Sequence, residues 1–196
     1  ASQHISTFNR ENFLPYFEED EIFNRRFYDF RTLVSCENLS KELQEAIKKK
    51  ADEIYKKNET NYSCLIVNDL SPKQIFIRPD NKIGLCDFEI MAKGVASYDV
   101  GFFIANINIM RVVRPEYKEE LKEVMHHFLD IYFTHLEQNI DNPTFINFTK
   151  KHINFFIGTS MLNRIDAVPL EPHIPESKVE EIRNIGVEFI FNQRNF

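Results

Sequence analysis

Apolar residues recur at intervals of three and four along most of the 196-residue chain, and this pattern breaks once, between residues 62 and 90. Such spacing is typical of amphipathic helices, because it places the residues on one face of a helix with 3.6 residues per turn. The interrupted stretch instead holds three short, β-prone apolar runs at 64–67, 75–77 and 82–86. The pattern predicts one mainly α-helical lobe over residues 1–196, with a small β insertion at 62–90.

The same periodicity predicts where the helices lie. We expect one or two helices over 11–34, followed by single helices from Ser40 to Ile54, over 98–111, from Pro115 to Leu136, over 142–165 and over 177–192. Ser40 suits an N-cap and Pro115 the first turn of a helix. The helix after Pro115 carries an apolar stripe that we expect to face the core: Tyr117, Leu121, Val124, Phe128, Ile131 or Tyr132, and Leu136.

Two aspartates follow apolar runs of the β insertion, Asp69 after the first and Asp87 after the third. The turn-forming residues 78–81, Arg-Pro-Asp-Asn, predict that the second and third runs pair as a hairpin. This hairpin would bring Asp69, Gln74 and Asp87 to one edge. A carboxylate fixed at a strand end can act as a base or hold Mg²⁺. The alternative interpretation is that hairpin ends collect polar residues because loops face water.

Composition and charge exclude several classes of protein. With 43% hydrophobic residues, 19 Phe and 5 Gly, the chain is neither disordered nor a β-repeat protein. No apolar stretch is long enough to cross a membrane and the first residues do not resemble a secretory signal, so we expect a cytoplasmic protein. The net charge of −6 disfavours binding to nucleic acid or to a membrane and favours a cationic or neutral ligand. Cys36, Cys64 and Cys86 form no C-x-x-C pair and are predicted to be reduced core thiols.

The polar residues of the insertion also resemble a known family. The run Asp69-Leu-Ser-Pro-Lys-Gln74, followed by Asp87-Phe-Glu, resembles the catalytic loop and metal-binding motif of the aminoglycoside phosphotransferase and choline kinase family, which is related to the protein kinases. Gly94 and the stretches at 97–103 and 161–166 are similar to the family as well. The resemblance covers roughly residues 60 to 166.

The resemblance implies a fold, a reaction and a set of roles. The fold is the C-terminal lobe of a protein-kinase-like enzyme, and the reaction is ATP- and Mg²⁺-dependent transfer of phosphate to a hydroxyl of a small molecule. Asp69 matches the catalytic base, Asp87 the aspartate that holds Mg²⁺, and Gln74 a metal-ligating Asn. Ser71 joins Gln74 and Asp87 in the cofactor-binding set. Asp99 matches a residue that braces the catalytic loop, and capping the helix that opens beside it is an equal alternative.

Two departures from the family pattern bear on activity. Val67 and Asn68 precede Asp69 where the family has His-Gly, and Gln74 replaces Asn. Only predicted helices precede residue 60, so we expect the N-terminal, ATP-clamping lobe to be absent from this chain. Either the full-length protein supplies that lobe, or the chain is a naturally truncated relative. The chain is then the catalytic and substrate-binding lobe of a kinase, with a small hydroxyl acceptor for which the net charge favours a cation. The alternatives are a catalytically weak or inactive kinase-like scaffold that binds a partner, and a plain helical interaction domain.

Overall fold

The computed structural model describes residues 36–58, 62–166 and 174–192. Over these ranges the chain is mostly helical, as predicted. The α-helices and 3₁₀ turns are α3 (Lys41–Asn58), η4 (Pro72–Gln74), α4 (Ala96–Val113), η5 (Pro115–Tyr117), α5 (Lys118–Asn139), α6 (Pro143–Asp166) and α7 (Glu176–Ile190). The predicted helices from Ser40 onward are confirmed, with ends that differ by a few residues. The prediction for 11–34 lies outside the described residues.

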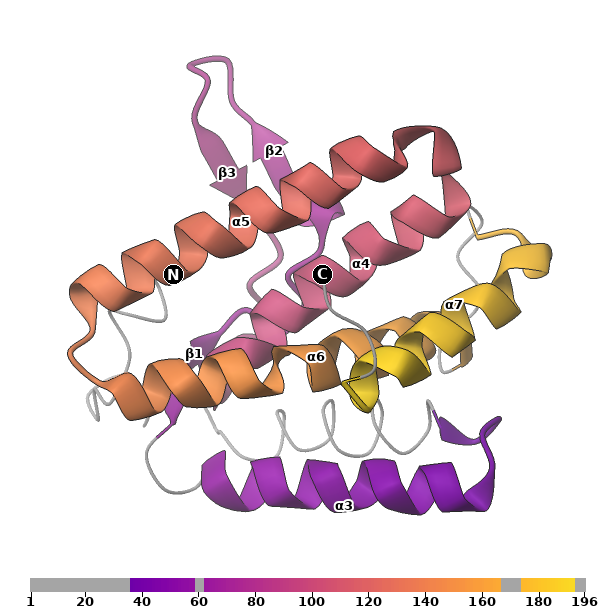
Figure 1. The fold of residues 1–196 in the computed structure, drawn as a ribbon. Helices are drawn as coiled ribbons and strands as arrows, with labels where there is room; N and C mark the ends of the chain where they lie inside the picture. The colour runs from indigo at the N-terminus through magenta and orange to yellow at the C-terminus, as the bar shows by residue number, and fades with distance from the viewer. Residues whose placement is uncertain (1–35, 59–61, 167–173, 193–196) are drawn as a thin grey trace.

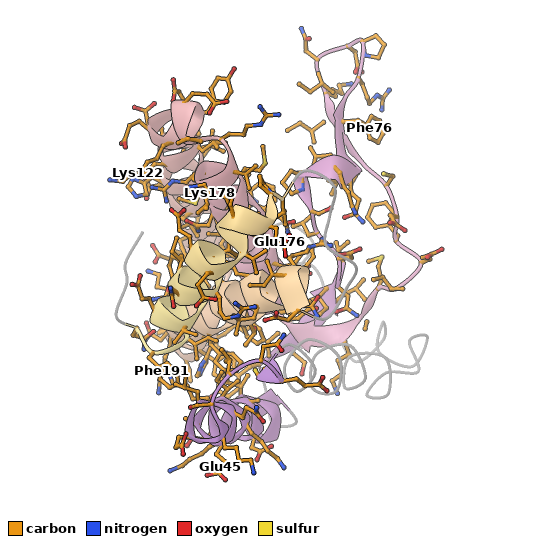
Figure 2. All side chains as sticks on the ribbon, turned by 90° about the vertical axis from the view of Figure 1, so that its right-hand side faces the viewer. Glu45, Phe76, Lys122, Glu176, Lys178 and Phe191 are labelled. Atoms are coloured by element: carbon orange, nitrogen blue, oxygen red, sulfur yellow. The ribbon has the colours of Figure 1, made fainter. Side chains whose placement is uncertain are left out.

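Four short strands form two separate antiparallel pairs. The predicted hairpin is confirmed as β2 (Ile75–Ile77) and β3 (Ile83–Leu85), with Phe76 opposite Gly84. The first run forms β1 (Ser63–Ile66), which pairs with β4 (Ala92–Val95), a strand that the sequence did not predict. The β region therefore extends past residue 90. The hairpin extends beyond the helical body (Figure 1), and Phe76 lies on it away from the helices (Figure 2).

Helix α4 is the centre of the core. It lies between α5 and α6 (Figure 1), and most of its residues are buried, as expected of a helix that is apolar on nearly every side. Helix α6 packs in turn against α7, at a point where a Cβ on Gly158 would lie 2.3 Å from the backbone oxygen of Gly186. Only a residue without a side chain allows the two backbones to come this close. Helix α4 also contacts β1, so the core holds the strand that leads into the loop with Asp69.

The buried face of α5 corrects the predicted stripe. Tyr132 and Leu136 are buried as expected, together with Met125 and Leu129. Two residues of the predicted stripe, Tyr117 and Val124, are exposed instead, and of the two alternatives Ile131 and Tyr132 it is Tyr132 that is buried. Apolar residues occupy two neighbouring rows of this helix, and periodicity alone does not say which row meets α4.

The cysteines and the helix lengths bear on two further predictions. Cys36 and Cys64 are buried, whereas Cys86 is exposed at the end of the hairpin, so the expectation of three core thiols is wrong for Cys86. Across the described part of the chain, no helix combines the length and the apolar character that crossing a membrane requires.

Candidate functional site

The loop after β1 is held in place by Asp99. This residue lies in the first turn of α4 and is 1% exposed. Its Oδ2 accepts a hydrogen bond from the backbone N–H of Val67 at 2.8 Å, and its Oδ1 accepts one from the N–H of Asn68 at 2.9 Å. One carboxylate thus satisfies two buried backbone donors directly before Asp69. Since Val95 is the N-cap of α4, the geometry favours the bracing role over the capping role.

Asn68 occupies a backbone conformation that few residues adopt. Its φ is 68°, in the left-handed region that Gly enters freely and that Asn tolerates better than most other residues. The side chain is fully buried, and its Nδ2 donates a hydrogen bond to the backbone oxygen of Ile90 at 3.2 Å. Asn68, which stands where the family has Gly, therefore still allows the loop conformation. Its side chain also links the loop to the segment that follows the hairpin.

The 3₁₀ turn η4 orients the side chain of Gln74. Pro72 opens the turn, and the Oε1 of Gln74 accepts hydrogen bonds from the backbone N–H of Ser71 at 2.9 Å and from its hydroxyl at 3.2 Å. Ser71 and Gln74 are 1% and 4% exposed. Because Ser71 holds the amide oxygen, the amide nitrogen of Gln74 is directed to the opposite side.

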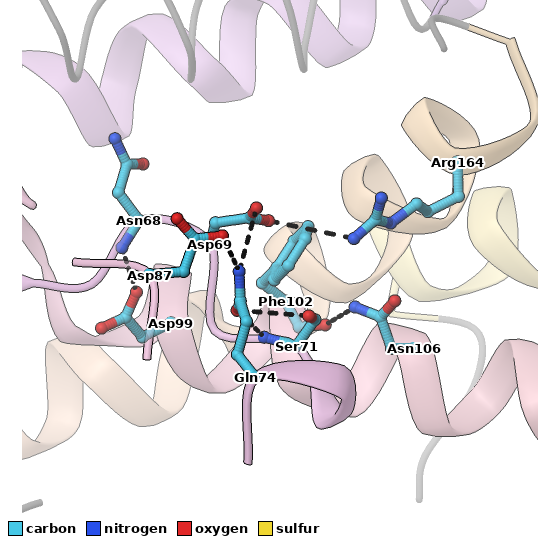
Figure 3. Close-up of polar contacts among 9 residues, drawn as sticks. All are labelled: Asn68, Asp69, Ser71, Gln74, Asp87, Asp99, Phe102, Asn106 and Arg164. Atoms are coloured by element: carbon cyan, nitrogen blue, oxygen red, sulfur yellow. Dashed lines mark hydrogen bonds and ion pairs between the residues drawn. The ribbon is translucent and has the colours of Figure 1, made fainter. Parts of the chain in front are cut away.

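That amide nitrogen brings the two predicted aspartates together. Nε2 of Gln74 donates to Oδ2 of Asp87 at 2.9 Å and lies 3.4 Å from Oδ2 of Asp69, its second acceptor (Figure 3). Asp87 follows β3, is exposed, and has a φ of 68°. The backbone N–H of Cys86 donates to the backbone oxygen of Gln74 at 3.1 Å, which fixes the end of the hairpin against η4. The hairpin thus places Asp69, Gln74 and Asp87 at one edge, as predicted.

A cation from the far end of α6 completes the cluster. Nη2 of Arg164 lies 3.9 Å from Oδ1 of Asp69, and the guanidinium stacks over the ring of Phe102 at 4.9 Å (Figure 3). The side chains of Arg164 and Asp69 are 11% and 21% exposed, so solvent screens their attraction only in part. The sequence marks Arg164 only as part of the stretch 161–166 that is similar to the family. Its position beside Asp69 follows from the packing of α6 on α4, which no local pattern reveals.

A pocket of about 230 Å³ opens beside this cluster. It lies between η4, the middle of α4 and the end of α6. The described residues that line it are Ser71, Pro72, Lys73, Asn106, Ile109, Met110, Arg164 and Ile174. Ser71 and Arg164 line the pocket, and Arg164 lies 3.9 Å from Asp69, so the pocket neighbours that carboxylate although Asp69 does not itself line it. Lys73 and Asn106 were not predicted as site residues, because their placement depends on the same packing.

The donor atoms decide whether these residues fit Mg²⁺. Carboxylates together with water and phosphate oxygens are its usual ligands, and Asp87 presents an exposed carboxylate. Gln74, the other predicted ligand, presents its amide nitrogen to Asp87. Rotation of the Gln74 amide by half a turn would direct its oxygen toward a metal at Asp87, but the backbone N–H of Ser71 would then lose its acceptor. The described residues contain no group of three or more His, Cys, Asp or Glu suited to a metal. Asp87 therefore fits a hydrated magnesium ion, and Gln74 fits it only in a different orientation.

Comparison with known proteins adds no identification. No protein-family model matches the chain, and a search of curated proteins finds no match. The resemblance noted in the sequence therefore depends on the residues of the β insertion and on how they are placed.

Proposed function

We propose that the chain is the catalytic and substrate-binding lobe of an ATP- and Mg²⁺-dependent phosphotransferase that acts on a hydroxyl of a small molecule. One observation carries the proposal. Asp69 lies on the loop between β1 and η4 and Asp87 follows β3, and both carboxylates lie within hydrogen-bonding reach of the same amide nitrogen of Gln74. A solvent-facing hairpin end accounts for either carboxylate alone, but it gives no reason for the two to meet beside a pocket.

The two aspartates have different roles in this proposal. Asp69, on the braced loop, accepts a hydrogen bond from the acceptor hydroxyl and takes its proton as the oxygen attacks the γ-phosphorus of ATP. The new O–P bond forms as the bond from phosphorus to the bridging oxygen breaks, and ADP leaves with that electron pair. Asp87 holds Mg²⁺, which neutralises charge on the phosphates when bound. Arg164 lies 3.9 Å from Asp69, close enough for its positive charge to attract and orient that carboxylate.

The test measures ADP release with a panel of small hydroxylated acceptors, using the full-length protein with any lobe that its gene encodes upstream. Asp69→Asn and Asp87→Asn should each lower kcat/KM by roughly a hundredfold to ten-thousandfold, because the first removes the base and the second removes the carboxylate that would hold Mg²⁺ on the phosphates. Asp80→Asn is the matched control, since Asp80 lies at the exposed hairpin tip, where it pairs with Arg78 and Lys82. If both site variants keep the turnover of the control, the assignment is wrong.

One observation favours a second candidate, a kinase-like scaffold without turnover. The amide nitrogen of Gln74 already links the two carboxylates, so the cluster is internally satisfied without a metal. A thermal-shift titration with ATP and Mg²⁺ separates the two candidates, because a ligand that binds only the folded state raises the unfolding temperature. A rise that is lost in Asp87→Asn supports the enzyme. A flat response in the full-length protein supports the scaffold.

A further inference from the structure

The charged residues that line the pocket have the opposite sign to the net charge of the chain, and the nearest carboxylate outside the lining that the structure places against them is Asp69, 3.9 Å from Arg164. The chain carries a net charge of −6. Among the described residues that line the pocket, however, the ionisable ones are Lys73 and Arg164, and both are cations. A bound molecule responds to the nearest charges far more than to distant ones, because solvent and salt screen charges beyond about 10 Å. The local charge, and not the net charge, is therefore the better guide to the acceptor.

The two cations are held in different ways. The Arg164 side chain is 11% exposed and its guanidinium carbon lies 4.9 Å from the centre of the Phe102 ring, so packing restricts its direction. Lys73 also lines the pocket, but it is exposed on η4 and its side chain is flexible. Asn106 is also fixed, because its Nδ2 donates to the backbone oxygen of Phe102 at 2.8 Å. A guanidinium held by packing and a flexible ammonium in the lining of one pocket suit a small carboxylate or phosphate group.

The size and the remaining lining restrict the acceptor further. The volume of about 230 Å³ is below the roughly 300 Å³ at which pockets for drug-sized ligands begin. Ile109 and Met110 provide an apolar side without further charge. The pocket is therefore suited to a small metabolite and not to an oligosaccharide.

We propose that the acceptor is a small hydroxylated anion, with its carboxylate or phosphate group bound between Lys73 and Arg164 and its hydroxyl directed at Asp69. This inference rests on the proposed phosphotransferase function, since it names the acceptor of that reaction. It replaces the cationic acceptor that the net charge favoured. The transfer step is unchanged: the hydroxyl proton passes to Asp69, the acceptor oxygen gains the γ-phosphoryl group, and ADP is the leaving group.

Binding is tested first, without ATP, by calorimetric titration of the chain at one fixed low ionic strength. Four small probes share a hydroxylated frame and differ in charge: glycerate, glycerol 3-phosphate, glycerol and choline. At least one of the two anions should bind at least about tenfold more tightly than glycerol and choline, as expected for hydrogen bonds to charged groups. Whichever of glycerate and glycerol 3-phosphate binds more tightly shows whether the pocket prefers a carboxylate or a phosphate group.

Charge variants then locate the site. Lys73→Glu should weaken anion binding by at least about tenfold and Lys73→Met by less, whereas Lys118→Glu, an equally exposed lysine at the start of α5, should leave it within about twofold. Choline binding that equals or exceeds anion binding would overturn the proposal. So would the absence of anion binding at millimolar concentration, or anion binding that does not depend on Lys73.

The ADP assay separates this inference from the function on which it rests. Phosphorylation of choline, with no reaction of either anion, would keep the phosphotransferase and reject the anionic acceptor. Anion binding that depends on Lys73, without ADP release from any probe in the full-length protein, would keep the anion site and reject the phosphotransferase.

Discussion

The two halves of the candidate site are built differently. The segment from Val67 to Gln74, which carries Asp69, is mostly buried and its backbone is fixed by Asp99. The hairpin that leads to Asp87 is exposed, with Ile77 at 77% and Phe76 at 47% exposure. The proposed base is thus placed by the core, whereas the proposed metal ligand is placed mainly by its link to Gln74.

This difference has a consequence for function. A group that orients a hydroxyl must be fixed before the substrate arrives, because misplacement of the reacting atoms lowers the rate steeply. A carboxylate that holds a hydrated metal tolerates more movement, since water completes the shell. The asymmetry therefore matches the two proposed roles. The four predictions below test it, beginning with the largest expected effect.

Removal of the brace should have the largest effect on stability. Asp99→Ala leaves the backbone N–H groups of Val67 and Asn68 buried without their acceptor, which should lower the free energy of unfolding by about 3 kcal/mol or more. Asp99→Asn keeps one acceptor oxygen and should cost roughly half as much. Urea unfolding measures both, with Asp130→Ala on the exposed face of α5 as the control. A loss below about 1 kcal/mol for Asp99→Ala would mean that the core does not fix the loop.

The cysteines give a second contrast between the two halves. Burial, with a further contribution from the charge of Asp99, raises the pKa of the Cys64 thiol well above its ordinary value. Burial and then Asp166 raise the pKa of Cys36 to about 12. Cys86 is exposed on the hairpin side. Since the thiolate is the reactive form, a chromogenic thiol reagent at neutral pH should modify Cys86 at least roughly a hundredfold faster than the other two.

Counting the modified thiols checks this prediction. The native chain should show one fast thiol and the urea-unfolded chain three. Cys86→Ser should remove the fast phase. If a second fast thiol appears in the native chain and persists in Cys36→Ser, it is Cys64 in β1. The half of the site next to β1 would then open readily, and the contrast between the halves would fail.

The backbone of Asn68 supplies a test that separates conformation from hydrogen bonding. Asn68→Ala places a β-carbon at a φ of 68° and removes the bond to Ile90, so we expect a loss of roughly 2 kcal/mol. Asn68→Gly removes the same bond without the strain and should lose roughly 1 kcal/mol. Equal losses in urea unfolding would show that the left-handed conformation does not limit the loop.

Much of the fold could be predicted from the sequence, because the helices from Ser40 onward and the hairpin depend on local patterns. Strand β4 could not, since Ala-Lys-Gly-Val has little intrinsic β propensity and becomes a strand only by pairing with β1. The buried face of α5 was predicted only in part: Tyr132 and Leu136 are buried as expected, but the row of Met125 and Leu129 was not distinguished from the neighbouring apolar row.

The candidate site divides in the same way. The meeting of Asp69, Gln74 and Asp87 follows from the hairpin and could be predicted. The direction of the Gln74 amide could not, because Ser71 determines it through a hydrogen bond that the sequence does not specify. The cationic lining of the pocket depends on α6 bringing Arg164 to η4, a contact between segments about ninety residues apart in the chain. Net charge was a poor guide there, because it averages over the whole surface.

The smallest effect is expected on the hairpin. Ile77 and Ile83 face each other across the pair and are 77% and 72% exposed, so Ile77→Ala or Ile83→Ala should change the free energy of unfolding by no more than about 0.5 kcal/mol. Ile66→Ala is the matched variant on the braced side, where the side chain is fully buried, and it should cost roughly 2 to 5 kcal/mol. A loss above about 1 kcal/mol for either hairpin variant would mean that another surface covers this face in solution. Unfolding at two protein concentrations would then show whether that surface is a second copy of the chain, since only an association between copies makes the transition depend on concentration.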